Sequence, residues 1–192
     1  LEFINPLEFQ KQIETNLIGV LNCIQAFLPL LGSTNNKPKV KKGRIINISS
    51  ALGGKIGYPF YGAYCSSKHA LEGFSETLRR ELTIHKIFVS VIAPGAIQTP
   101  IWDKADKESV NEKYEGTVYK NAYNRMLFDM TKLASNGLKP ETVATKIIHA
   151  VETPNPKFRY TFISEFTLNL LYFAPRILID KLVTKYLGLV KK

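Results

Sequence analysis

The chain has 192 residues, 45% hydrophobic and 22% charged, which is the composition of an ordinary globular domain with enough apolar residues for a real core. Its net charge of +10 suggests at first sight a polyanion as partner. However, four lysines and an arginine crowd into residues 36–44, a stretch with Pro and Gly, and basic residues do not alternate with base-stacking aromatics. We therefore expect solvated loop charge and no nucleic-acid binding.

Helical periodicity opens the chain, and an apolar stripe predicts a helix over residues 6–31. A polar loop follows at 32–43, and then the β-branched run in "GRIINISS" predicts a buried strand. The glycine-containing connection "ALGGKIGYPF" leads into a second amphipathic helix over 61–84. The run at 87–93 predicts a second buried strand, which Pro94-Gly95 ends.

The second half of the chain is less regular. Residues 100–137 are polar, rich in aromatics and poorly periodic, so we expect an irregular stretch that acts as a substrate lid. A helix is expected from about Pro140 to Val151, and a last strand at 159–164. Residues 165–192 form an apolar, Lys-bearing segment that either caps an apolar substrate pocket, which we favour, or lies on a membrane surface.

The order of these elements alternates helix and strand, which predicts an α/β domain with a parallel sheet. We expect residues 1–192 to form a single domain. A parallel sheet of only three strands buries itself poorly, because both of its faces and its edges need cover. We therefore expect the chain to be the C-terminal part of a larger doubly wound, Rossmann-like domain. The chain opens with Leu and not Met, so the lack of a signal peptide in it has no meaning.

Cysteine, histidine and hydropathy patterns suggest an intracellular protein. Cys23 and Cys65 both fall in expected helices, so we expect reduced thiols and a cytoplasmic location, with peripheral membrane contact as the alternative. Neither cysteine belongs to a CxxC pair, and the three histidines are scattered, so we expect no metal site. No apolar run has transmembrane length.

Four features point to one site. Tyr64 precedes Lys68 by four residues, so the two side chains share one face of the second helix. Ser50 ends the first strand, and Pro94-Gly95 ends the second. Ligands of open α/β sheets bind outside the carboxyl ends of the strands, where these residues are expected to meet. Asn16 lies in the middle of the first helix.

The motifs "NLIGVLNCIQAFLPLL", "GRIINISS", "YCSSK" and "PGAIQTP", in this order, resemble the short-chain dehydrogenase/reductase family, and more narrowly its hydroxysteroid and retinol dehydrogenases. The resemblance is specific over residues 1 to about 100. It implies an enzyme that uses NAD or NADP to transfer a hydride to or from a hydrophobic alcohol or ketone. It also implies a homodimer or homotetramer that pairs through the helices at 6–31 and 61–84. The alternative is a non-catalytic binding or assembly module, or a truncated form, that keeps the fold without binding dinucleotide.

The resemblance also assigns roles to residues. Tyr64 is implied to be the general acid/base, and Lys68 to lower the pKa of the phenol and to bind the nicotinamide ribose. Ser50 is implied to hold the substrate oxygen, and Asn16 to anchor a water in a proton relay. Contacts with the nicotinamide carboxamide are implied for the segment after the second strand, which contains Pro94, Gly95, Ile97 and Thr99. A free tyrosine has a pKa near ~10, so the lysine and the positive ring of an oxidised nicotinamide together must lower it by about three units.

Two features depart from the family pattern. Ser50 lies fourteen residues before Tyr64, one more than expected, so Ser49 is a second candidate for its role. The glycine-rich phosphate loop and the residue that selects between NAD and NADP are not in the sequence. We expect them to precede Leu1 in a longer native polypeptide, and we expect this chain alone to bind dinucleotide very poorly.

Overall fold

A computed structural model describes the chain except for residues 33–42, 52, 103–111, 164–169, 171 and 191–192. The chain forms two compact units, each built from segments that are distant in sequence. The first contains Leu1, 3–94 and 141–162, and the second contains Glu2, 95–140 and 163–192. The single domain expected over 1–192 remains a prediction.

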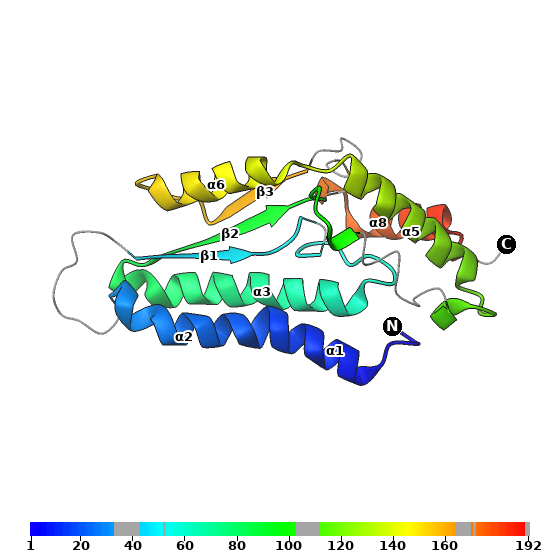
Figure 1. Ribbon diagram of the computed structural model, residues 1–192, viewed down its shortest axis with the longest axis horizontal. Coiled ribbons are helices and arrows are strands. Elements are labelled where there is room, and N and C mark those ends of the chain that lie inside the picture. The colour runs from blue at the N-terminus through cyan, green and yellow to red at the C-terminus, as the bar shows by residue number, and fades with distance from the viewer. Residues whose placement is uncertain (33–42, 52, 103–111, 164–169, 171, 191–192) are drawn as a thin grey trace. The chain divides into compact units, whose positions relative to one another are not determined.

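The first unit is built on a three-stranded parallel sheet with the order β1-β2-β3. These strands are β1 (Arg44–Ile48), β2 (Phe88–Pro94) and β3 (Arg159–Phe162). Helix α3 (Gly62–Glu81) lies along one face of the sheet and α6 (Pro140–Glu152) along the other (Figure 1). The predicted α/β fold with a Rossmann-like parallel sheet is confirmed.

The register of the sheet brings the carboxyl ends of the strands to one edge. Ile48 of β1 pairs with Ile92 of β2, and Pro94 of β2 pairs with Phe162 of β3. The central strand β2 is the most buried, with every residue from Val89 to Pro94 buried. Residues that follow β1 therefore meet those that end β2.

The helix predicted over residues 6–31 is confirmed as one continuous rod. It consists of α1 (Pro6–Ile13), a π-helical turn at Glu14–Ile18 and α2 (Gly19–Leu31). At its start the Asn5 side chain accepts a hydrogen bond of 2.9 Å from the backbone N–H of Leu7. It ends at Gly32, whose φ of 107° favours glycine.

The core of the first unit lies between this rod, the sheet and α3 (Gly62–Glu81), which continues into a 3₁₀ turn at Leu82–His85. Apolar side chains from all three meet there, so amphipathic helices cover one face of the sheet. The buried members of the cluster are Ile24, Ile45, Leu78, Leu82, Ile87 and Val89.

The rod also corrects one prediction from the sequence. Residues Pro6–Leu31 are long and apolar enough to cross a membrane by length and composition. The statement that no apolar run has this length is therefore wrong. A single such helix is weak evidence for a membrane span, and in this structure one side of the rod packs against α3.

The second unit contains α5 (Lys120–Ser135) and α8 (Arg176–Leu187), which pack against each other. Arg125 donates a hydrogen bond of 2.6 Å to the Tyr186 carbonyl and covers its ring at 5.1 Å. The irregular structure expected across 100–137 is wrong for the residues of α5. Part of the remainder, 103–111, lies outside the described residues, and the proposed lid role stays a prediction.

Candidate active site

Tyr64 and Lys68 lie one turn apart on α3, as their spacing predicts. The Lys68 Nζ lies 5.8 Å from the centroid of the Tyr64 ring. It donates a hydrogen bond of 2.9 Å to the carbonyl of Ile48, the last residue of β1. The end of β1 therefore anchors the ammonium, and the described contacts use one of its three N–H donors.

Ser50 lies just beyond β1, close enough to Tyr64 for its hydroxyl to lower the pKa of the phenol. Its Oγ also accepts a hydrogen bond of 3.2 Å from the Gly53 N–H. The Ser49 Oγ, by contrast, is buried and has no hydrogen-bond partner among the described residues. Ser50, and not its neighbour, is therefore the serine that the structure brings to the tyrosine.

Two glycines after Ser50 allow the segment that follows β1 to pack closely against Tyr64 and Ser49. A Cβ on Gly53 would lie 2.7 Å from Cε1 of Tyr64, and a Cβ on Gly54 would lie 2.5 Å from the Ser49 Oγ. Both distances are shorter than van der Waals contact, so only glycine fits without a shift of the neighbours. The sequence analysis missed this contact of Gly53, although the Gly-Gly pair itself is a signal of close backbone approach.

Asn16 lies in the π-helical turn between α1 and α2. Its Nδ2 donates a hydrogen bond of 3.0 Å to the Ser67 Oγ, which in turn donates to the Tyr64 carbonyl at 2.8 Å. π-Helical turns are rare and occur frequently at functional sites. The structure therefore links Asn16 to the backbone of Tyr64 through Ser67, a buried serine that the sequence analysis did not single out.

The electrostatics of the pair are dominated by burial. Burial raises the pKa of Tyr64, and the hydrogen bond from Ser50 opposes this shift in part. Burial also lowers the pKa of Lys68. The direction for Tyr64 is opposite to the lowering that the resemblance implies. The lowering of the Tyr64 pKa that the resemblance implies depends in part on the positive charge of an oxidised nicotinamide. The chain by itself keeps this phenol protonated at neutral pH.

Pro94, the last residue of β2, accepts a hydrogen bond of 2.8 Å from the Ala51 N–H and thereby holds the segment after Ser50 at this edge. Gly95, Ile97 and Thr99 follow in the second unit. There Ile97 pairs with Leu138 in an isolated bridge. The roles of these four residues at a cofactor remain predictions.

Three relatives have names that agree with the resemblance. The 3-ketodihydrosphingosine reductase of Bacteroides thetaiotaomicron is 35% identical, over 83% of this chain and 56% of that protein. Retinol dehydrogenase 7 of Rattus norvegicus is 29% identical, over 99% of the chain and 60% of that protein. The human 17-beta-hydroxysteroid dehydrogenase type 6 is 28% identical, over 96% and 59%.

Solved structures share the fold. A short-chain dehydrogenase from Streptomyces avermitilis has a TM-score of 0.67 at 22% identity, over 98% of this chain and 64% of that one. A short-chain dehydrogenase/reductase from Burkholderia phymatum in complex with NAD has a TM-score of 0.60 at 23% identity, over 88% and 57%. The alcohol dehydrogenase of Thermococcus sibiricus, complexed with 5-hydroxy-NADP, has a TM-score of 0.58 at 22% identity, over 91% and 59%.

The match to the family itself covers more than half of the chain. The sequence profile described as "short chain dehydrogenase" matches residues 1–110, which include Asn16, Ser50, Tyr64 and Lys68. The chain spans 56–60% of the length of the three relatives named above. On this sequence match and the shared fold, the chain belongs to the short-chain dehydrogenase family.

Proposed function

We propose that the protein containing this chain is an oxidoreductase that uses NAD or NADP to interconvert a hydrophobic ketone and its alcohol. One observation carries the proposal: the Ser50 hydroxyl lies close enough to Tyr64 to lower the pKa of its phenol, and Lys68 is fixed one helical turn away at the end of β1. A phenol with a serine beside it and an ammonium close by is suited to protonate and deprotonate a substrate oxygen.

The residues of the chain fit the nicotinamide end of such a cofactor. Lys68 has N–H donors beyond the one that binds Ile48, and its place next to Tyr64 suits a ribose hydroxyl. Pro94 ends β2 at the carboxyl edge, where ligands of such sheets bind, and Gly95, Ile97 and Thr99 follow it in the sequence. When bound, the reduced cofactor supplies a hydride to a carbonyl carbon.

Side chains of this chain bind the substrate oxygen and exchange a proton with it. Ser50 Oγ holds the oxygen by a hydrogen bond, and Tyr64 Oη donates the proton that converts it to a hydroxyl. In the reverse direction Tyr64 accepts this proton, so the phenolate must be stabilised. The ammonium of Lys68 supplies positive charge close to the ring for that purpose. Asn16 fixes this turn of α3 through Ser67.

The substrate class rests on the relatives and on composition. The three named relatives are called after a ketosphingoid base, retinol and a hydroxysteroid, each of which combines a large hydrocarbon part with an alcohol or ketone. The second unit, which contains the expected lid at 100–137, also exposes apolar side chains such as Ile101 and Phe128. We propose a ketone or alcohol of lipid, steroid or retinoid type.

The test compares two tyrosine substitutions in the polypeptide that contains this chain. Tyr64→Phe should reduce turnover of apolar ketones about 10²–10⁴-fold, because it removes the proton donor, while the affinity for nicotinamide cofactor is kept. Tyr61→Phe is the matched control: it removes a hydroxyl from a neighbouring ring, 6.3 Å away between centroids, and turnover should stay near that of the wild type.

The proposal would be wrong if Tyr64→Phe turned over ketones as fast as the wild type with either cofactor. Wild-type protein that bound an apolar ketone and cofactor without any turnover would favour the non-catalytic module.

A further inference from the structure

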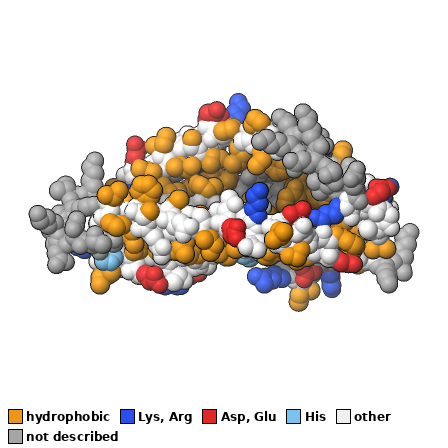
Figure 2. Space-filling model, turned by 60° about the horizontal axis from the view of Figure 1, so that its bottom comes forward, with side chains coloured by type: hydrophobic (Ala, Val, Ile, Leu, Met, Phe, Trp, Pro, Cys, Tyr) orange, Lys and Arg blue, Asp and Glu red, His pale blue; other side chains and the backbone are white. Residues whose placement is uncertain are grey.

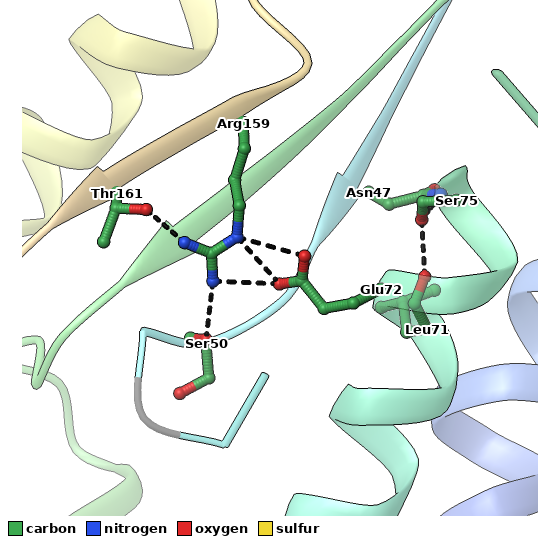
Figure 3. A network of polar contacts seen from close by, with 7 residues as sticks. All are labelled: Asn47, Ser50, Leu71, Glu72, Ser75, Arg159 and Thr161. Carbon is green, nitrogen blue, oxygen red and sulfur yellow. Dashed lines mark hydrogen bonds and ion pairs between the residues drawn. The ribbon is translucent and has the colours of Figure 1, made fainter. Parts of the chain in front are cut away.

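An ion pair joins β3 to α3 and lies near the candidate active site. Arg159 is the first residue of β3, and Glu72 lies on α3. Their two parallel hydrogen bonds, Nε to Oε2 at 3.0 Å and Nη2 to Oε1 at 3.1 Å, match the fork of the guanidinium (Figure 3). Their side chains are 19% and 16% exposed. A partly buried ion pair of this kind is by itself weak evidence for a role in stability.

The same guanidinium contacts the segment that holds Ser50. Its Nη2 lies 3.5 Å from the Ser50 carbonyl oxygen, and its Nη1 donates to the Thr161 Oγ1 (Figure 3). The Ser50 carbonyl also accepts a hydrogen bond of 3.0 Å from the Gly54 N–H. Arg159 therefore touches the backbone of the residue whose hydroxyl lies beside Tyr64 and lowers its pKa.

Glu72 contacts the same segment from the helix side. A Cβ on Gly54 would lie 2.6 Å from the Glu72 Oε1, so the carboxylate packs directly against this glycine. The ion pair is thus in contact with both ends of the turn from Ser50 to Gly54. Any change in its geometry acts first on that turn.

The position of Glu72 on α3 connects it with the proposed catalytic residues. It follows Lys68 by four residues and Tyr64 by eight, so all three lie on the same face of the helix. Without Arg159, the carboxylate would be an unpaired charge one turn from the Lys68 ammonium. It would then compete with the Ile48 carbonyl for that ammonium.

We propose that Arg159 and Glu72 are a positioning pair, which holds Ser50 against Tyr64 and leaves Lys68 bound to the end of β1. This inference rests on the proposed function, because the position of Ser50 matters for catalysis only if Ser50 binds the substrate. Neither residue touches the substrate. Both act through the turn between Ser50 and Gly54.

Arg159→Lys tests the pair, because it keeps the charge and removes the planar fork. We expect kcat to fall roughly 10–100-fold while the KM for the nicotinamide cofactor stays the same, since a small misplacement of Ser50 harms the chemical step. In a Ser50→Ala background the same substitution should have almost no further effect, because the residue that it positions is already lost.

A second readout needs no activity. In protein labelled with ¹⁵N-glycine, hydrogen exchange of the Gly54 amide reports directly on its bond to the Ser50 carbonyl. Arg159→Lys should accelerate this exchange by about tenfold. Arg44→Lys is the matched control. Arg44 is the first residue of β1, at the opposite end of the strand from Ser50, and it donates hydrogen bonds to the carbonyls of Ala150 and Thr153. It should leave both kcat and the Gly54 exchange unchanged.

Two results would overturn the inference. One is an unchanged rate of Gly54 exchange in Arg159→Lys. The other is a double variant, Arg159→Lys with Ser50→Ala, whose fold-loss of kcat equals the product of the losses of the two single variants. That result would mean that the two residues act independently. Failure of the proposed function alone would look different: the Gly54 exchange would still accelerate, while Tyr64→Phe would retain full turnover.

Discussion

Gly53 shows how little room surrounds the ring of Tyr64. A methyl group at this position would lie 2.7 Å from Cε1 and 3.1 Å from Cδ1 of the ring. We predict that Gly53→Ala displaces the phenol and reduces kcat about 10–100-fold, because small misplacements of reacting groups are costly. Steady-state turnover with an apolar ketone measures this.

Gly57 supplies the control for this prediction. A Cβ at Gly57 meets no atom within 4 Å. Gly57→Ala should therefore leave kcat and the free energy of unfolding close to their wild-type values. If both alanine variants lost turnover equally, the cause would be the flexibility of the connection and not contact with the ring.

A second prediction at the residue scale concerns alkaline pH. Burial raises the pKa of Tyr64, so the folded protein keeps this phenol protonated where the unfolded chain has already ionised it. The unfolded state then binds fewer protons, and the free energy of unfolding falls as the pH rises above about 10. Tyr64→Phe should lose less stability than the wild type between about pH 9 and 11. Urea unfolding at both pH values checks this, and an equal loss would contradict it.

The residues that lie around Tyr64 were readable from the sequence, because Lys68 follows it by one helical turn and Ser50 follows the first strand; their roles stay predictions. The contacts of Gly53, Ser67, Glu72 and Arg159 were not. Arg159 lies 87 residues beyond Glu72 in sequence, and only the crossover that brings β3 beside β2 joins the two. Pairs of this kind depend on the topology, which local patterns do not encode.

At the scale of elements, a buried hydrogen bond fixes α3 on the sheet. Asn47 of β1 donates from Nδ2 to the Ser75 Oγ at 2.8 Å, and Ser75 donates to the Leu71 carbonyl (Figure 3). Ser75→Ala should lower the free energy of unfolding by about 1–3 kcal/mol, because it leaves a buried amide without its acceptor. Urea unfolding measures the change.

The double variant Asn47→Val, Ser75→Ala separates this cause from simple loss of packing. It removes both partners, so it should be less destabilised than the sum of the two single variants. Strict additivity would show that the Asn47–Ser75 hydrogen bond contributes nothing of its own.

Element prediction succeeded where apolar periodicity is strong and failed where it is mixed. The helices at 6–31 and 61–84 and all three strands follow from clear patterns. Helix α5 was missed because its buried positions include small and aromatic residues, such as Ala122 and Tyr123, within a polar stretch. Their burial comes from packing within the second unit, which overrides weak local periodicity.

At the scale of the whole molecule, apolar side chains remain widely exposed, as the face in Figure 2 shows. On α2, Phe27 is 60% and Leu30 is 70% exposed. The resemblance implies that copies of the protein pair through this helix. We predict that Phe27→Glu combined with Leu30→Glu converts a dimer or tetramer into a monomer, measured by light scattering.

The control places the same charge on another exposed apolar residue. Val118, in the second unit, is 92% exposed, and Val118→Glu should leave the oligomer intact. A wild type that is monomeric at micromolar concentration would contradict the expected pairing.

The sequence alone also indicated that a three-stranded parallel sheet is part of something larger. The coverage of the relatives, 56–60% of their length, agrees with this expectation. The choice between NAD and NADP could not be predicted, because no residue that makes it was recognised in this sequence.

Transfer of deuterium from cofactor to product tests the central claim most directly. The polypeptide that contains this chain is supplied with a hydrophobic ketone and with NADH or NADPH that carries deuterium at the transferable position of the nicotinamide. We predict one deuterium on the carbinol carbon of the product alcohol with the wild type, and product formation reduced about 10²–10⁴-fold with Tyr64→Phe. Product without deuterium, or equal deuterium transfer by both proteins, would contradict the assignment of Tyr64 as the acid of a hydride-transfer enzyme.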